Sequence, residues 1–240
     1  TMPCVFAEAG MEHAKEHGTT FEQFAKISVK NHHHSTMNPK AMYQIETPLD
    51  EVMNAEMISY PNTKLMCSVN VDGSAAAVLV SEKKAKELGM ARAVKVRASA
   101  MASDPYTDRD LVMPDVNACT RLAAKDAYEQ AGIGPEDVNL VELHDCFATA
   151  EMLHYENLGL CKDGEAGKMI DEGHVNLGGK VPVNVSGGLL SKGHPLGATG
   201  IANIYEICTH LRGEAGKRQV EGARIGMTHV IGLSLIHISE

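Results

Sequence analysis

The stretch NVSGGLLSKGHPLGATG, residues 184–200, decides the fold class of this 240-residue chain. It follows a short β-branched run at residues 181–185, and the segment after it, residues 199–212, has apolar side chains at helical spacing: Ile201, Ile204, Cys208 and Leu211. A strand that runs into a glycine-rich turn and then a helix is typical of α/β proteins. We therefore predict an α/β fold in which helices cover a sheet.

The same alternation of strands and helices continues toward both ends of the chain. Helical periodicity predicts helices at residues 3–17, 20–34, 82–88, 116–131 and 147–158. Strand-like patterns occur at residues 65–71, 93–99, 138–143 and 222–231. The apolar run at residues 74–80 predicts a short buried strand.

Composition excludes several classes of function. The formal net charge is −9, from 22 basic and 31 acidic residues, which argues against nucleic acid as the main partner. No apolar run approaches the roughly 20 residues of a membrane-spanning helix. The six cysteines are spread without a CxxC pair, which indicates reduced thiols in a cytoplasm-like compartment. No signal sequence precedes Met2 and no Ser-Lys-Leu tripeptide ends the chain, and we expect both ends to be cut.

His194 is the first candidate catalytic residue, because it lies at the glycine-rich turn between strand and helix. A neutral imidazole there could take a proton from a thiol or donate a hydrogen bond to an oxyanion. The N-terminus of the following helix also offers free N–H groups to an anion. The alternative is a structural histidine that is hydrogen-bonded within a tight turn.

The second candidate is the run His144-Asp145-Cys146-Phe147, which follows the predicted strand at 138–143. In open α/β sheets ligands bind outside the carboxyl ends of the strands. Cys146 would be reactive if His144 or the next helix lowered its pKa. The alternative is a buried, inert cysteine, which is the usual state of a free thiol.

Two other histidine patterns are weaker. Adjacent histidines on a helix point in different directions, so His32-His33-His34 is predicted to be a solvated surface run. Glu151-x-x-His154 has half of the pattern of a di-iron site, but such sites need a second copy and further carboxylates.

Several motifs in order resemble the thiolase superfamily. The segment GHPLGATG, residues 193–200, preceded by Asn184 and Gly187-Gly188, resembles the histidine loop of that superfamily. The segment VELHDCF, residues 141–147, resembles the sterol carrier protein X type, where most thiolases carry Asn-Glu-Ala-Phe. Residues 72–77 and 211–220 resemble the same branch, and the similarity extends over residues 1–232.

The resemblance implies an enzyme that joins or cleaves 3-ketoacyl-CoA by Claisen chemistry through an acyl-cysteine. His194 would activate that cysteine and help to form an oxyanion hole. His144 stands where most thiolases have an asparagine that orients a water, and Cys146 would be the acid/base at the α-carbon. His229 replaces the cysteine that usually has this last role. We also expect four residues to contact the substrate: Phe147, Gly187, Gly188 and Gly193.

The resemblance further implies a layered α/β/α/β/α fold, a homodimer in the complete enzyme, CoA thioesters as substrates, and no cofactor or metal. Residues 1–90 match the end of the N-terminal half of the fold, and residues 91–240 match the C-terminal half. None of the six cysteines lies in a nucleophile motif, so we expect the nucleophile half to be absent from this chain. The tail, residues 233–240, is atypical of the family.

We therefore predict a lipid-metabolic acyltransferase of the thiolase type that is cytoplasmic, or peroxisomal or mitochondrial in a eukaryote. Two alternatives remain open. One is a retro-aldolase of the same fold that shortens steroid side chains without an acyl-cysteine. The other is a non-catalytic subunit that binds acyl-CoA or lipid, which the missing nucleophile allows.

Overall fold

The structure is a computed structural model that describes residues 2–103 and 112–232. Its helices are α1 (Met2–His17), α2 (Phe21–Thr36), α3 (Leu49–Asn54), α4 (Glu82–Glu87), α5 (Met113–Ala131), α6 (Ala148–Asn157), α7 (Ala166–Asp171) and α8 (Thr199–Leu211). Its strands are β1 (Met57–Ser59), β2 (Asn62–Thr63), β3 (Leu140–Glu142) and β4 (Gly226–Thr228). The atypical tail, 233–240, lies outside the described residues.

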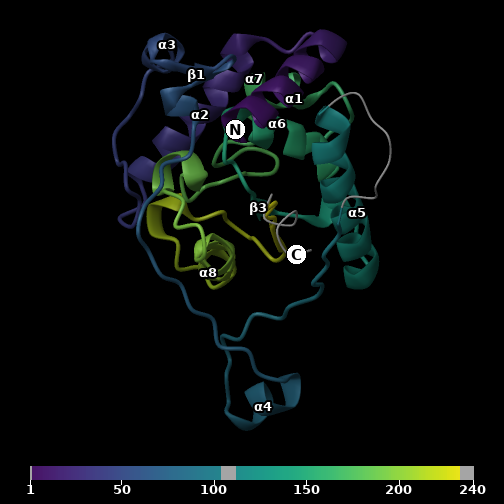
Figure 1. Cartoon of the computed structure of the whole chain (residues 1–240). Helices are drawn as coiled ribbons and strands as arrows, with labels where there is room; N and C mark the ends of the chain where they lie inside the picture. Colours follow the sequence, from purple (N-terminus) through teal and green to yellow (C-terminus); the bar gives the residue numbers. More distant parts are fainter. Residues whose placement is uncertain (1, 104–111, 233–240) are drawn as a thin grey trace.

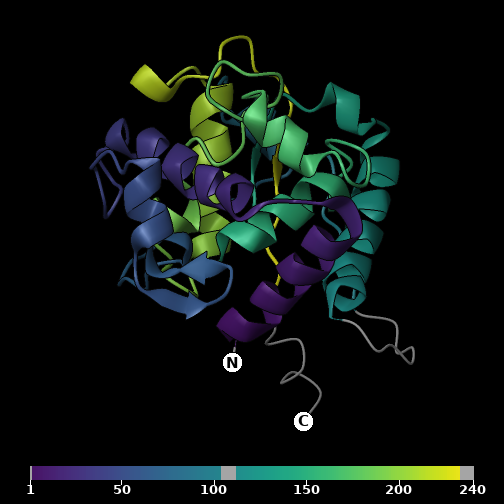
Figure 2. The same ribbon diagram turned by 90° about the horizontal axis from the view of Figure 1, so that it is seen from above.

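Helix α6 is the centre of the fold, because all ten of its residues are buried. Helices α1, α2, α5 and α7 surround it in Figures 1 and 2. Thr20 starts α2 by accepting a hydrogen bond from the Gln23 amide, and the Gln23 side chain accepts one from the Thr20 amide. The largest core cluster joins these helices through fully buried side chains such as Phe24, Met152 and Tyr155. The predicted helices at 3–17, 20–34, 116–131 and 147–158 are thus confirmed to within a few residues.

A small parallel sheet lies beside α6. Strand β3 pairs with β4 in the register Leu140 to Gly226 and Glu142 to Thr228. On its other side Val141 pairs in parallel with Val183, which is the part of the predicted strand 181–185 that forms. Ile207 of α8 packs with Leu140 in a second core cluster, so a helix covers this sheet. The α/β fold class is confirmed.

Residues 72–101, here named the arm, extend away from the rest of the molecule and carry α4 (Figure 1). Val78 and Leu79 are 87% and 81% exposed. The predictions of a buried strand at 74–80 and a strand at 93–99 are therefore wrong for this chain, since both segments are extended but unpaired in the described structure. A strand needs a neighbouring strand to satisfy its backbone groups and cover its apolar side chains. The arm contacts α5 only through bonds such as that from the Ser99 amide to the Gln130 side chain, and none of the described strands pairs with it.

The histidine run of α2 is the second correction. His33 is exposed as predicted, but His32 and His34 are buried. Nδ1 of His34 lies 3.0 Å from the carbonyl oxygen of Asn184, and its Nε2 accepts from the Leu177 amide at 3.0 Å. Burial, with a smaller effect of Lys30, lowers the pKa of His34 to about 3, so the ring is neutral.

Two short helices, α3 and α7, and the hairpin β1–β2 were not predicted, because each is too short to show periodicity.

No helix of the described residues has both the length and the apolar character needed to cross a membrane.

Candidate active site

Three segments that are distant in sequence meet at the carboxyl end of β3. They are the loop 143–147, the turn 187–194 and the segment 67–71. The Ser68 amide donates to the Cys146 carbonyl at 2.9 Å, and the His194 amide donates to the Val69 carbonyl at 2.8 Å. Segment 67–71 therefore holds the two predicted catalytic loops next to each other.

His144 and His194 lie close together in this arrangement. Their ring centroids are 5.1 Å apart and the rings meet edge to face. Both residues are 7% exposed. Burial first, and then His194 and His229, lower the pKa of His144 to about 3. Burial first, and then Lys192, lower the pKa of His194 below its usual value. Both rings are therefore neutral at neutral pH.

The hydrogen bonds of Thr199 define the tautomer of His194. Oγ1 of Thr199 donates to the Pro195 carbonyl at 3.1 Å and lies 2.8 Å from Nδ1 of His194. Because a hydroxyl has one proton, Oγ1 accepts the hydrogen bond from Nδ1–H. Nε2 of His194 is then the unprotonated nitrogen, as a general base requires.

Cys146 is buried between these loops. Burial raises the pKa of its thiol well above the usual value, and the neighbouring Asp145 raises it further. Cys67 lies beside it, since Cys67 pairs with Phe147 in an antiparallel bridge. Burial raises the pKa of Cys67 to about 11. Both thiols are therefore protonated at neutral pH, so neither is an activated nucleophile at rest.

Asp145 joins the two loops. Its carboxylate accepts from the Leu189 amide at 2.7 Å, from the Leu190 amide at 3.3 Å and from Nδ2 of Asn31 at 2.8 Å. Gly188 has a φ of 60°, and a Cβ at that position would collide with this carboxylate. The glycine is thus required both by the backbone conformation and by the close approach of Asp145.

A buried layer of polar side chains supports the loops from α2 and α6. Lys30 donates to Glu151 at 2.6 Å, and Nδ2 of Asn184 donates to the same carboxylate at 2.9 Å. Oδ1 of Asn184 accepts from the Leu143 amide at 2.9 Å. Asn184 has a φ of 52°, a conformation that asparagine tolerates better than most residues. This residue therefore fixes the start of both loops at once.

The four predicted substrate-contacting residues lie at the same place, but their own contacts are structural. The Phe147 ring packs against Phe6 with centroids 5.6 Å apart. Gly193 has a φ of 115°, and a Cβ there would lie 2.8 Å from a methyl group of Val71. Gly187 and Gly188 form the start of a single π-helical turn. Their contact with substrate stays a prediction.

His229 extends the histidine cluster on the side of His144. Its Nε2 lies 3.2 Å from Oγ1 of Thr120, and its ring centroid is 4.5 Å from that of His154. Burial lowers the pKa of His229 to about 4. Both nitrogens of His154 are buried without a hydrogen-bond partner among the described residues. Four neutral imidazoles thus follow one another from His194 to His154.

Sequence reasoning placed His144, Cys146 and His194 together but did not predict their supporting residues. Thr199 was visible five residues after His194 in the same quoted loop. Glu151 and Asn31 gave a weaker signal, because each is a polar residue among the buried residues of its helix.

Comparison with known proteins shows the family to which the chain belongs. A sequence profile of the family described as "Thiolase C-terminal domain-like" matches residues 103–239. Sterol carrier protein 2 of Oryctolagus cuniculus is 46% identical over 235 residues, which are 96% of this chain and 43% of that protein. Acetyl-CoA acetyltransferase of Methanothermobacter thermautotrophicus is 44% identical over 235 residues, covering 97% of this chain and 60% of that protein.

Among solved structures, an "Ltp2-ChsH2(DUF35) aldolase" has a similar fold, with a TM-score of 0.77 at 24% identity over 93% of this chain and 59% of that one. The chain thus spans between about two fifths and three fifths of the length of these relatives. The profile covers more than half of the chain. The chain belongs to the thiolase C-terminal domain-like family.

Proposed function

We propose that this chain carries the acid–base residues of a thiolase-type acyltransferase that acts on CoA thioesters. The observation that carries the proposal is the position of His194, whose unprotonated Nε2 is defined by Thr199 and whose ring lies against His144. A thiol, Cys146, is buried on the same loop as His144. These are the groups that activation of a nucleophile and proton transfer at carbon require.

His194 acts in two steps of this proposal. Its Nε2 first takes the proton of the attacking thiol, which leaves a thiolate for attack on the acyl carbonyl. The imidazolium then donates a hydrogen bond from Nε2 to the oxyanion. The positive charge of Lys192 disfavours a positive charge on the nearby His194, so the imidazolium of His194 gives the proton back more easily.

Cys146 exchanges a proton with the α-carbon. When a 3-ketoacyl-CoA is cleaved, the protonated thiol gives its proton to the carbanion that is left, and in condensation the thiolate removes a proton from the α-carbon. The raised pKa of Cys146 favours the protonated form at rest. The rate of proton removal is therefore expected to increase with pH, because the thiolate fraction increases.

The relatives support the substrate class. One is named acetyl-CoA acetyltransferase, and it is similar to nearly the whole chain. We assign the acyl-accepting cysteine, and the homodimer, to the complete enzyme. CoA is a substrate in this scheme, and the proposed steps use side chains alone.

The test is the exchange of α-protons of acetyl-CoA in deuterated water, followed by NMR. This half-reaction needs the acid/base and the oxyanion donors, but it does not need transfer of an acyl group. We expect exchange by the parent chain and a fall of roughly 10²–10⁴-fold in Cys146→Ala. His194→Ala should lose about 10²–10³-fold, the effect of one oxyanion donor.

Cys208→Ala is the matched control, because Cys208 is a half-buried cysteine on α8 away from the loops. It should exchange at the parent rate. Binding of acetyl-CoA without any exchange would support the non-catalytic subunit instead. Parent-rate exchange in Cys146→Ala would place the base elsewhere, with His229 as the next candidate.

A further inference from the structure

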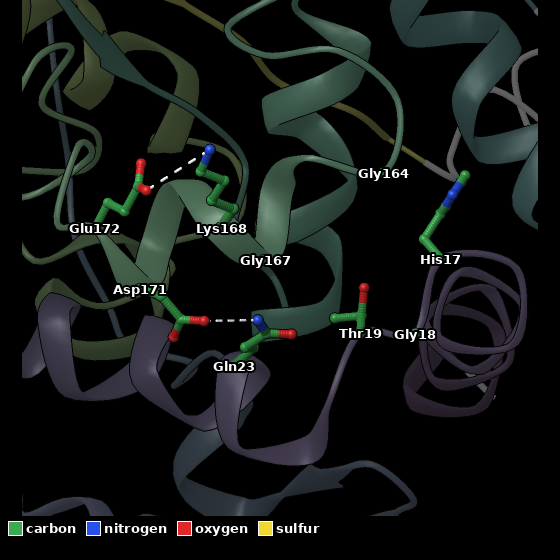
Figure 3. A pocket seen from close by; sticks show the side chains of 9 residues that line it. All are labelled: His17, Gly18, Thr19, Gln23, Gly164, Gly167, Lys168, Asp171 and Glu172. Carbon is green, nitrogen blue, oxygen red and sulfur yellow. Dashed lines mark hydrogen bonds and ion pairs between the residues drawn. The ribbon is translucent and has the colours of Figure 1, made fainter.

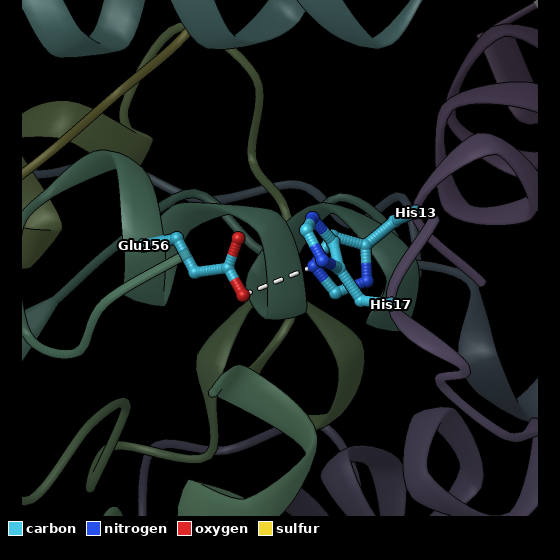
Figure 4. A group of neighbouring side chains, drawn as sticks. All are labelled: His13, His17 and Glu156. Carbon is cyan, nitrogen blue, oxygen red and sulfur yellow. Dashed lines mark hydrogen bonds and ion pairs between the residues drawn. The ribbon is translucent and has the colours of Figure 1, made fainter. Parts of the chain in front are cut away.

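A second cluster of ionisable side chains lies outside the candidate active site, where α1 meets the end of α6 (Figure 4). It consists of His13 and His17 from α1 and Glu156 from α6. One ligand atom from each of the three residues lies within 4.8 Å of the other two. His13 and Glu156 are buried, and His17 is partly exposed.

The helix presents the two histidines in a suitable way. Residues four apart lie on one face of a helix, and the ring centroids of His13 and His17 are 4.7 Å apart. Nδ1 of His13 lies 2.8 Å from Oγ1 of Thr19, which leaves its Nε2 directed at Glu156. Such a second hydrogen bond is the usual way in which a metal-binding histidine is oriented.

Glu156 is also held in place. Its Oε1 accepts from the Gly164 amide at 2.9 Å and from the Ala166 amide at 3.3 Å. Nε2 of His13 lies 3.0 Å from the same oxygen. Two ligands of a tetrahedral zinc ion, with bonds of about 2.0–2.1 Å, are roughly 3.3 Å apart. These two atoms already have nearly the separation of a pair of ligands on one ion.

We propose that His13, His17 and Glu156 form a binding site for a divalent transition-metal ion, with Zn²⁺ as the best match. Two imidazoles and one carboxylate are a ligand set that Zn²⁺ accepts, with a fourth position for water. The surroundings also favour a cation, because Oε1 of Glu16 lies 3.8 Å from Nε2 of His17 and adds a negative charge beside the site. This differs from the expectation that the chain has no metal.

A cavity of about 340 Å³ gives the ion a route from solvent. His17, Thr19 and Gly164 are among the residues that line it (Figure 3). Gly164 has a φ of 83°, and a Cβ there would lie 2.9 Å from Nδ1 of His17, so a side chain at this position would displace the ring. The fourth ligand of the ion would be a water on this side.

The consequence of binding is structural, and it does not depend on the proposed enzymatic function. The ion would tie α1 to the C-terminal end of α6, and α6 begins directly after Cys146 and Phe147. An ion that binds the folded chain raises its melting temperature, by about 5–10 °C when the free ion is at 100 times its Kd.

The experiment is calorimetric titration of the chelator-treated chain with ZnCl₂, together with melting curves. We expect one ion per chain and a rise in melting temperature. His17→Ala should weaken binding at least tenfold, because it removes one of the three ligands, and His17 is the most exposed of the three. Glu156→Gln should do the same while its remaining oxygen still accepts from Gly164.

The matched control is His33→Ala, because His33 lies 2.7 Å from Glu46 on the surface and has the same pair of residue types without a third ligand. It should bind Zn²⁺ like the parent. Spectra of bound Co²⁺ should show a tetrahedral site without sulfur ligation, which separates it from the free cysteines. Equal affinity in the parent and His17→Ala, or sulfur ligation, would overturn the proposal.

Discussion

Replacement of Asp145 by alanine tests how the loop 143–147 and the turn 187–194 are held together. In the folded chain the Asp145 carboxylate accepts hydrogen bonds from the amides of Leu189 and Leu190 and from Asn31. Nδ2 of Asn31 also donates to Glu151 at 2.7 Å, so Asn31 keeps a partner after the substitution. The two backbone amides do not.

Each buried donor without an acceptor costs about 1–3 kcal/mol, so two cost about 2–6 kcal/mol. The substitution also removes a buried carboxyl whose pKa is raised by burial and by Glu151, and this relief offsets part of the loss. We therefore expect the free energy of unfolding to fall by about 2–4 kcal/mol, a large part of the 5–15 kcal/mol typical of a domain.

The assay is urea unfolding of Asp145→Ala beside Asp163→Ala. Asp163 is the surface counterpart, since its carboxylate accepts two hydrogen bonds from Arg121 at 2.7 and 3.1 Å. An exposed pair of this kind contributes about 0–1 kcal/mol. Hydrogen exchange should also accelerate at the Leu189 and Leu190 amides in Asp145→Ala. A loss of less than about 1 kcal/mol, with unchanged exchange at both amides, would refute the role assigned to Asp145.

Two further predictions concern pH and association. In the folded chain burial holds the pKa of His34 at about 3, whereas an unfolded histidine titrates near 6.5. The unfolded chain therefore takes up the proton first, and His34 lowers the free energy of unfolding as the pH falls from about 6.5 toward 3. His34→Gln, which cannot titrate, should therefore lose fewer degrees of melting temperature than the parent between pH 7 and pH 5, and equal losses would contradict a neutral His34. The exposed apolar side chains of the arm, with Ile204 and Tyr205 of α8, should make the isolated chain self-associate in sedimentation velocity. The double variant Val78→Lys, Leu79→Lys should reduce this association. A parent chain that stays monomeric at every concentration would show that the exposed apolar side chains of the arm do not cause self-association.

The parts of the fold that the sequence predicted correctly are those with local signals. Helix α2 has a capping box at Thr20, and α5 has apolar spacing over nineteen residues before Gly132. The turn around His194 is marked by its glycines, three of which (Gly187, Gly188 and Gly193) have a positive φ and close neighbours. These signals lie within a few residues of the structure that they specify.

The errors occurred where the outcome depends on distant residues. The arm has the pattern of strands, but a strand forms only beside a partner. The buried ring of His34 is hydrogen-bonded to two residues: the Asn184 carbonyl accepts from it and the Leu177 amide donates to it. Both residues lie more than 140 positions away in the sequence. The sequence motifs predicted that His144, Cys146 and His194 lie in one site. That Asp145, Glu151 and Thr199 support them could be seen only from the side-chain contacts of the folded chain.

The central claim is that Cys146 faces the α-carbon of a bound CoA thioester, beside His144 and His194. Bromoacetyl-CoA tests this directly, because its α-carbon is electrophilic and a sulfur that faces it displaces bromide and forms a stable thioether. After incubation of the chain, peptide mapping by mass spectrometry should find the label on Cys146, slowed by added CoA. The label should be lost in Cys146→Ala and slowed in His194→Ala. Labelling of Cys67 or Cys208 with Cys146 unmodified, or labelling that CoA does not slow, would contradict the account.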